Sequence, residues 1–198
     1  MDKLKSLQEY QGILSLGYVY LIIMGILKES LYYNQLGVDI LKYSTITDVL
    51  ISPISGLTNS GLGLSIFLIL FLFVLGTPSW LAKKKDKNWF NKIFKVDNNL
   101  SVLEVKQAIK QTFFLVFALG LFGFYVGNGI GYGNKIANQI NKKELDFNDK
   151  LNFSDGQEST VSLLGKNSTY LFYVEKGKTD IAITPIHSGL IKSIIETK

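Results

Sequence analysis

The stretch TFFLVFALGLFGFYVGNGIGYG, residues 112–133, decides how this sequence folds. It carries no charged side chain and is longer than the about 20 residues that a helix needs to cross ~30 Å of hydrocarbon. Two further apolar blocks of similar length lie at residues 11–28 and 62–80. We therefore predict an integral membrane, mainly α-helical protein with three transmembrane helices. A cleavable signal peptide is the rival interpretation of the first block, but that block lacks a small-residue cleavage site and two spans follow it.

Composition excludes several classes of protein. The chain has 198 residues, of which 47% are hydrophobic, and it contains no Cys, so disulfide and thiolate chemistry are excluded. All 21 basic residues are Lys, which argues against bidentate recognition of phosphate or guanine by Arg. We expect no nucleic-acid partner and attribute the net charge of +5 to membrane topology. Abundant Lys, Asn and Ile suggest an AT-rich bacterial genome.

The Lys distribution predicts the orientation in the bilayer. Cytoplasmic loops carry an excess of Lys, and the loop at residues 81–111 holds eight: Lys83, Lys84, Lys85, Lys87, Lys92, Lys95, Lys106 and Lys110. The first loop, residues 28–61, holds two Lys that are offset by acids. We expect a multi-pass protein of the bacterial inner membrane, with the N-terminus and the basic loop 81–111 cytoplasmic and the C-terminal region extracytoplasmic.

The basic loop also predicts a lipid contact. NWFNKIFK, residues 88–95, places Trp89, Phe90, Ile93 and Phe94 on one helical face, with Lys92 and Lys95 turned away. Such a helix can lie among lipid headgroups and meet anionic lipid. The alternative is a stop-transfer anchor without a specific ligand. The candidate lipid-interface residues are Lys83, Lys84, Lys85, Trp89, Phe90 and Phe94. SVLE, residues 101–104, is a capping box from which a helix should run into the third span.

The first loop is too apolar for a solvated connection. Ser44 or Thr45 can cap a helix that runs to Ser52, where Pro53 would kink or end it. About a dozen residues are too few to span a bilayer, so we expect an interfacial or re-entrant half-helix. Asp39 and Asp48 are candidate acids at a pore mouth, and the alternative is that they are solvated or cap a helix.

Residues 141–198 change character and predict a small β-rich domain, distinct from the transmembrane helical domain at residues 1–140. Short β-branched and aromatic runs alternate with Gly and Pro. YLFYVE and DIAITP, joined across EKGK (residues 175–178), predict a hairpin whose first strand is apolar on both faces. So small an antiparallel unit is not stable alone. It should pack on the membrane helices or on copies of itself.

The glycines of the third span allow two interpretations. Gly-Tyr-Gly at residues 131–133 matches the centre of a potassium filter, but no pore helix precedes it and the Thr that usually opens a filter is missing. Small residues spaced four apart instead predict a helix-packing seam followed by a flexible helix exit. In a homo-oligomer the same residues could line a narrow pore. The candidate seam or pore residues are Gly120, Gly123, Gly127, Asn128 and Gly131.

Enzyme signatures are missing from the sequence. It has no P-loop, nucleophile elbow or metal-ligand spacing, and its one histidine, His187, is a candidate pH sensor or an ordinary surface residue. We expect no enzymatic activity, cofactor or metal. The first hypothesis is a homo-oligomeric membrane component that senses or transmits a signal and contacts membrane lipids, with a protein partner at the β unit. Its general layout occurs among phage-defence and toxin-immunity proteins. The alternative is a triggered ion channel or membrane-permeabilising pore.

Overall fold

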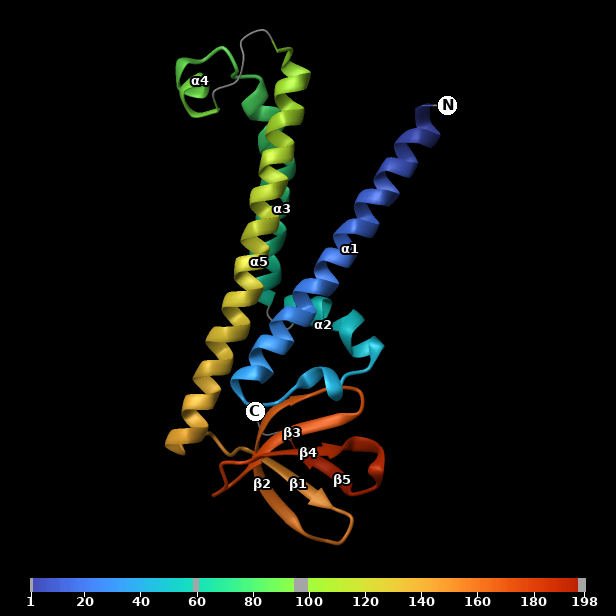
Figure 1. Ribbon diagram of the computed structural model, residues 1–198, viewed down its shortest axis with the longest axis vertical. Coiled ribbons are helices and arrows are strands. Elements are labelled where there is room, and N and C mark those ends of the chain that lie inside the picture. The colour runs from blue at the N-terminus through green and yellow to red at the C-terminus, as the bar shows by residue number, and fades with distance from the viewer. Residues whose placement is uncertain (1, 59–60, 95–99, 196–198) are drawn as a thin grey trace. The chain divides into compact units, whose positions relative to one another are not determined.

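The computed structural model of the chain describes residues 2–58, 61–94 and 100–195. Its helices are α1 (Asp2–Gln35), η1 (Ile40–Lys42), α2 (Ile46–Thr58), α3 (Gly61–Ala82), α4 (Asn88–Phe94), α5 (Val102–Lys142) and η2 (Ile186–Ser188) (Figure 1). Its strands are β1 (Asp149–Phe153), β2 (Glu158–Lys166), β3 (Tyr170–Glu175), β4 (Ile181–Pro185) and β5 (Ile191–Ile195). The chain forms two compact units, Met1–Pro53 with Tyr125–Lys198, and Ile54–Phe124.

Three helical stretches are long and apolar enough to cross a membrane, as the sequence predicts: Leu14–Gln35, Leu64–Ala82 and Val102–Lys142. Their outward side chains are large and aliphatic. Leu14, Ile69 and Leu119, one from each stretch, are 73%, 66% and 61% exposed. Exposed apolar surface on this scale needs a non-aqueous environment. The protein is a mainly helical membrane protein with a C-terminal antiparallel sheet.

The predicted capping box starts α5. The Ser101 hydroxyl and backbone N–H donate to Glu104 Oε2 at 2.7 and 2.8 Å, and the Glu104 N–H donates back to Ser101 Oγ at 3.3 Å. From there α5 runs without interruption through the third apolar block. It ends at Lys142, beyond the helix exit expected near residue 134. Polar residues extend it because Gln, Lys and Ala are good helix formers.

Helix α2 also extends beyond Ser52, its predicted last residue. Thr45 is the cap, since its hydroxyl accepts the Asp48 N–H at 3.2 Å. The helix then continues through Pro53 to Thr58. Of the two effects expected of Pro53, a kink or the end of the helix, the second does not occur.

The five strands form one antiparallel sheet in the order β4-β3-β2-β1-β5. The predicted hairpin is present as β3 and β4, with Phe172 opposite Ile183. An ion pair of 2.6 Å between Glu175 and Lys178 spans its turn. Four consecutive β3 residues, 171–174, are buried, which confirms that both faces of this strand are covered.

One face of the sheet closes on itself. Leu151, Val161, Leu171 and Tyr173 form a buried cluster, to which β4 adds Ala182 and β5 adds two isoleucines. All five strands therefore supply side chains to one small core. This arrangement reduces the apolar surface that the sheet must cover with other parts of the chain.

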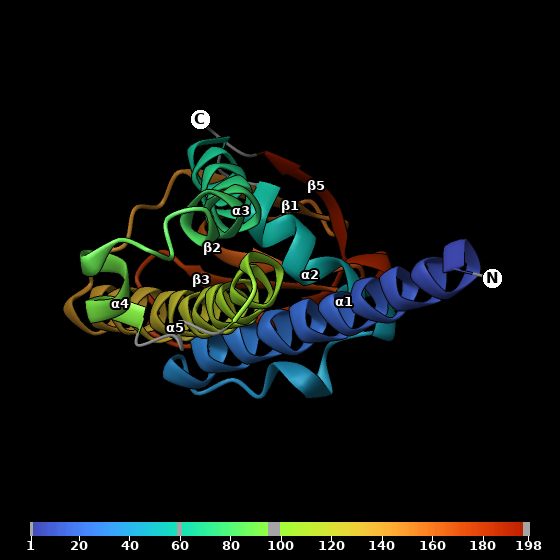
Figure 2. The same ribbon diagram turned by 90° about the horizontal axis from the view of Figure 1, so that it is seen from above.

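The C-terminal halves of α1 and α5 lie side by side (Figure 2). The contact is closest at Gly129 and Gly133. A β-carbon built at either glycine would lie 2.7 Å from a backbone oxygen of α1, that of Lys28 or that of Tyr32. Such a contact has no room for a side chain, because the obstacle is backbone and not a movable side chain.

Replacing these glycines tests the contact between α1 and α5 directly. Gly133→Ala should destabilise the protein by about 1–3 kcal/mol, because the added methyl group forces the two helices apart. The matched control is Gly131→Ala, since a β-carbon there meets no described atom within 4 Å. The measurement is unfolding in mixed detergent micelles of increasing denaturing-detergent content, followed by circular dichroism. Equal stability of the two variants would contradict the packing shown here.

Candidate functional site

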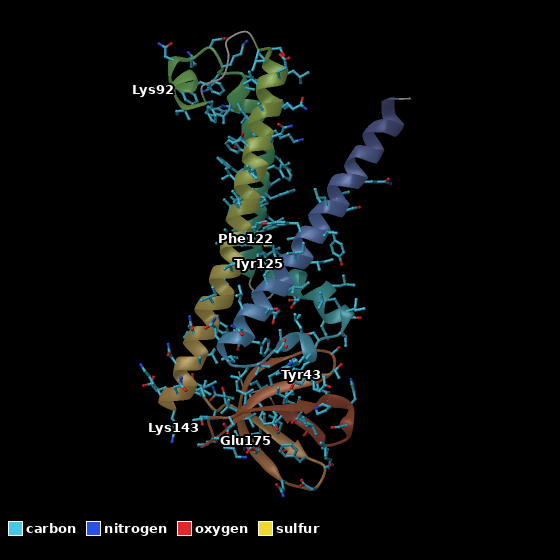
Figure 3. All side chains as sticks on the ribbon, viewed as in Figure 1. Tyr43, Lys92, Phe122, Tyr125, Lys143 and Glu175 are labelled. Atoms are coloured by element: carbon cyan, nitrogen blue, oxygen red, sulfur yellow. The ribbon has the colours of Figure 1, made fainter. Side chains whose placement is uncertain are left out.

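The sheet and the end of α1 meet in an aromatic cluster, which we call the aromatic junction. Tyr32 and Tyr33 of α1 are buried there with Phe172 of β3, and Tyr43 packs against them from the loop after η1 (Figure 3). The ring centroids of Tyr33 and Phe172 are 4.8 Å apart. Tyr32 and Tyr33 are only 7% and 4% exposed, so this pair of rings is a docking contact for the sheet.

A β-bulge in β2 fits the sheet to these tyrosines. The pairing with β3 skips a residue between Leu163 and Gly165, which leaves Leu164 out of the register. The Leu164 carbonyl accepts a hydrogen bond of 3.0 Å from the Tyr32 hydroxyl. A β-carbon on Gly165 would overlap the Tyr33 hydroxyl, so glycine is required at this position. No feature of the sequence alone identifies these two residues as docking residues.

This junction explains why the compact units divide the chain differently from the expected boundary at residue 140. The sheet packs on α1 at Tyr32 and Tyr33, so it shares a unit with that helix and with the end of α5. Packing on the membrane helices is one of the two ways in which the sheet was expected to be covered.

A second contact, which we call the Asp48 clip, ties α2 to the turn between β2 and β3. Asp48 Oδ1 accepts the Ser168 N–H at 2.9 Å, and Asp48 Oδ2 accepts the Ser168 hydroxyl at 3.0 Å. The same oxygen, Oδ2, accepts the N–H and the hydroxyl of Thr45 at 2.9 and 2.7 Å. One carboxylate thus caps a helix and also holds a turn about 120 residues away in sequence.

These donors favour the charged form of Asp48. Partial burial alone would raise its pKa, but the hydrogen bonds from Thr45 and Ser168 outweigh that effect and hold the pKa below its ordinary value. The other predicted acid, Asp39, lies on the surface and pairs with Lys42 at 3.4 Å. His187 reaches the same turn, with Nε2 at 3.2 Å from the Ser168 carbonyl.

A cavity of about 620 Å³ lies beside β4, between the end of α1, the following loop and the end of α5. Its apolar wall includes Val38, Ile140 and Ile183. Asp39, Lys42 and Asp180 bring charges to its lining. β4 is also an edge strand of the sheet, and an edge strand has backbone groups that can pair with another chain.

The glycines of α5 divide between two faces of the helix. Gly129 and Gly133 pack on α1, whereas β-carbons on Gly120, Gly123, Gly127 and Gly131 would meet no described atom within 4 Å. Residues two apart on an α-helix point about 200° apart. The alternating run GNGIGYG therefore builds two small-residue faces on opposite sides of α5. Asn128 lies exposed beside the second face. The glycines that spacing singles out lie on the open face, and Gly129 and Gly133 on the packed face were not among them.

The predicted lipid-interface residues lie at or near α4, where they point in different directions. Phe90 is fully buried with Leu81, Val105 and Ile109, and Phe94 packs on that cluster, so the Phe90 side chain does not reach lipid. Trp89 is 41% exposed. Lys92 is exposed (Figure 3), as is Lys83. Lys84 and Lys85 are half-buried, and Lys95 lies outside the described residues.

The Asp48 clip makes a pH-dependent prediction. The folded pKa is lowered, so its stabilisation is fully present above the unfolded value of about 3.9 and is lost as pH falls through the folded pKa. Asp48→Asn should increase hydrogen exchange of the Ser168 amide about fivefold at neutral pH. After correction for intrinsic exchange rates, this difference should persist to about pH 5 and shrink below about pH 4. Asp39→Asn is the matched control, and a clip without function in holding the turn would leave both variants like the wild type.

Within the described residues, no group of three or more His, Asp or Glu side chains is placed to hold a metal ion. The chain matches no known protein family, and neither a characterised protein nor a solved structure is detectably similar to it. Functional inference therefore rests on the geometry of the aromatic junction, the Asp48 clip and the two faces of α5.

Proposed function

We propose that this chain is a non-enzymatic, homo-oligomeric protein of the bacterial inner membrane that senses and transmits a signal. The observation that carries the proposal is the direct attachment of the sheet to membrane-spanning helix. Tyr32 and Tyr33, which dock the sheet, belong to the same helical stretch, Leu14–Gln35, that is apolar enough to cross the bilayer. A ligand or protein partner that displaces the sheet therefore acts on α1 without an intervening linker.

The contacts continue from α1 to α5. The ring of Tyr32 stacks on that of Tyr132 with centroids 5.5 Å apart, and the next residue, Gly133, contacts the α1 backbone. Close-packed interfaces repack between discrete arrangements and do not deform gradually. A shift at the β2 bulge would thus reach Gly133, at the contact between α5 and α1, through Tyr32 and Tyr132. The cavity beside β4 is the place where we expect the partner or ligand.

The open face of α5 supports the oligomeric part of the proposal. Small residues at 120, 123, 127 and 131 let another helix approach closely, which is how membrane helices associate when lipid removes the hydrophobic driving force. A second copy of the chain is the partner we assign to this face. Phage defence or toxin immunity is the setting we propose, by analogy of layout alone.

A triggered pore is the second candidate, and the exposed Asn128 beside the open glycines favours it. In a ring of α5 helices these residues would line a narrow path instead of packing against each other. An oligomer that conducts in planar bilayers and loses conductance, but not assembly, on Asn128→Leu would establish the pore. A properly assembled oligomer without conductance would exclude it.

Assembly itself is tested by Gly127→Leu. The larger side chain should break the oligomer, because it fills the face on which the second helix packs. The readout is the mass of the protein in lipid nanodiscs, measured by light scattering. Gly17→Leu is the matched control, since Gly17 on α1 is also open within the described structure. A monomeric wild type, or a Gly127→Leu variant that still assembles, would contradict the proposal.

The orientation is tested by labelling, for which a chain without Cys is a suitable background. We expect a membrane-impermeant maleimide to react in intact cells with Lys178→Cys in the β3–β4 turn and not with Lys83→Cys after α3. Both lysines are exposed, so access depends on the membrane. The reverse result would place the sheet in the cytoplasm, where the signal would then arise.

A further inference from the structure

A groove of about 650 Å³ lies in the unit formed by residues 54–124, apart from the aromatic junction. One face of α3 forms its long wall, through Leu72, Phe73, Gly76, Thr77, Trp80 and Leu81. Trp89 of α4 and Phe113 of α5 complete the lining. Apart from the Thr77 hydroxyl and the indole N–H groups, the lining side chains are apolar.

The position of the groove on α3 relates it to the bilayer. The lining runs from residue 72 to residue 81, which at 1.5 Å per residue covers about 14 Å of the helix axis. This is close to half of the ~30 Å hydrocarbon thickness, or one leaflet. The groove belongs to the membrane-spanning stretch Leu64–Ala82 and occupies its C-terminal half. Its length therefore matches one lipid chain that enters from the nearer membrane surface.

Aromatic and basic side chains gather at the surface end of the groove. Trp80 and Trp89 are 56% and 41% exposed although they are the largest side chains nearby. Lys84 Nζ lies over the Trp80 ring, 4.1 Å from its centroid. Amphipathic indole rings and Lys side chains are the groups that proteins place at the level of lipid headgroups.

The charge around this end is strongly positive. Between residues 83 and 94 the sequence has five lysines, at positions 83, 84, 85, 87 and 92, and one acid, Asp86. Lys85 is already engaged, because its ammonium group donates to the Leu100 carbonyl at 2.7 Å. Lys84 is held at the rim by Trp80. Its ammonium group has three N–H donors, and those directed away from the ring can bind an anion.

We propose that this groove is a binding site for one anionic glycerophospholipid. One acyl chain lies along α3 between Trp80, Trp89 and Phe113, and the phosphate is bound at Lys84. The inference goes beyond general contact with lipid headgroups, since it assigns a chain-sized groove and an anion contact to the same molecule. It is independent of the signalling role, which depends on the other compact unit.

The chain carries its own probe for this site. Both of its tryptophans line the groove, so its intrinsic tryptophan fluorescence reports on that groove. Acyl chains brominated near the middle quench tryptophan on contact. The full-length protein is reconstituted into phosphatidylcholine vesicles that contain a low fraction of either brominated phosphatidylglycerol or brominated phosphatidylcholine. We expect about fivefold higher occupancy by the anionic lipid, the preference expected for one Lys contact at a membrane surface.

Two variants separate the parts of the site. Gly76→Leu should reduce quenching by the anionic lipid to the level of the zwitterionic one, because the new side chain fills the groove. It should leave the fold intact, since a β-carbon on Gly76 meets no heavy atom of the described residues within 4 Å. Lys84→Gln should abolish the preference for the anionic lipid and leave quenching by the zwitterionic lipid unchanged. Gly17→Leu and Lys106→Gln are the matched controls and should behave like the wild type.

Three results would overturn the proposal. Equal quenching of the wild type by the two brominated lipids would mean that the groove holds bulk lipid only. Absence of quenching by either lipid would mean that another protein segment or a second copy covers it. A preference that survives Lys84→Gln, or that survives Gly76→Leu in a protein with unchanged circular dichroism, would place the anion contact elsewhere.

Discussion

The close approach of α5 to α1 at Gly129 and Gly133 is the constraint on which the rest of its compact unit depends. At these two positions a β-carbon on α5 would lie 2.7 Å from a backbone oxygen of α1. That contact sets Tyr132 against Tyr32, and it leaves Tyr32 and Tyr33 oriented towards the sheet. Larger residues at these two positions would push α5 away from α1 and change the surface on which β2 and β3 pack.

The sheet is too small to be stable alone, and its two faces are covered in different ways. One face forms a small core from all five strands, and the other contributes Phe172 to the aromatic junction. The polar requirements of the contact are met locally. The Leu164 carbonyl, displaced from the strand register by the bulge, accepts from Tyr32, and Asp48 accepts from Ser168. A buried carbonyl without such a donor would destabilise the contact.

Structure that depends on local sequence patterns could be predicted, and long-range contacts could not. The spans, the Ser101 capping box and the β3–β4 hairpin each depend on neighbours within a few residues, so periodicity and turn chemistry predict them. The extension of α2 past Pro53 and of α5 to Lys142 shows that a helix boundary also depends on its surroundings.

In the candidate site, too, local patterns could be predicted from the sequence and long-range contacts could not. Gly120, Gly123, Gly127 and Gly131 were singled out by spacing, but spacing alone does not say which of two glycine faces packs inside the chain. The tyrosines after the first span look like membrane-interface residues until the sheet covers them. The partnership of Asp48 with Ser168, or of Gly165 with Tyr33, joins segments more than 100 residues apart and leaves no local signal.

The hydrogen bond from Tyr32 to Leu164 also has a consequence for the order of folding. It joins positions 132 residues apart, so the first helix is synthesised long before the strand that completes its docking surface. Contacts of such high sequence separation form late and slowly. Until that strand is synthesised, Tyr32 and Tyr33 at the end of α1 are therefore not covered by the sheet. A transiently exposed aromatic surface of this kind is prone to aggregation until the strand arrives.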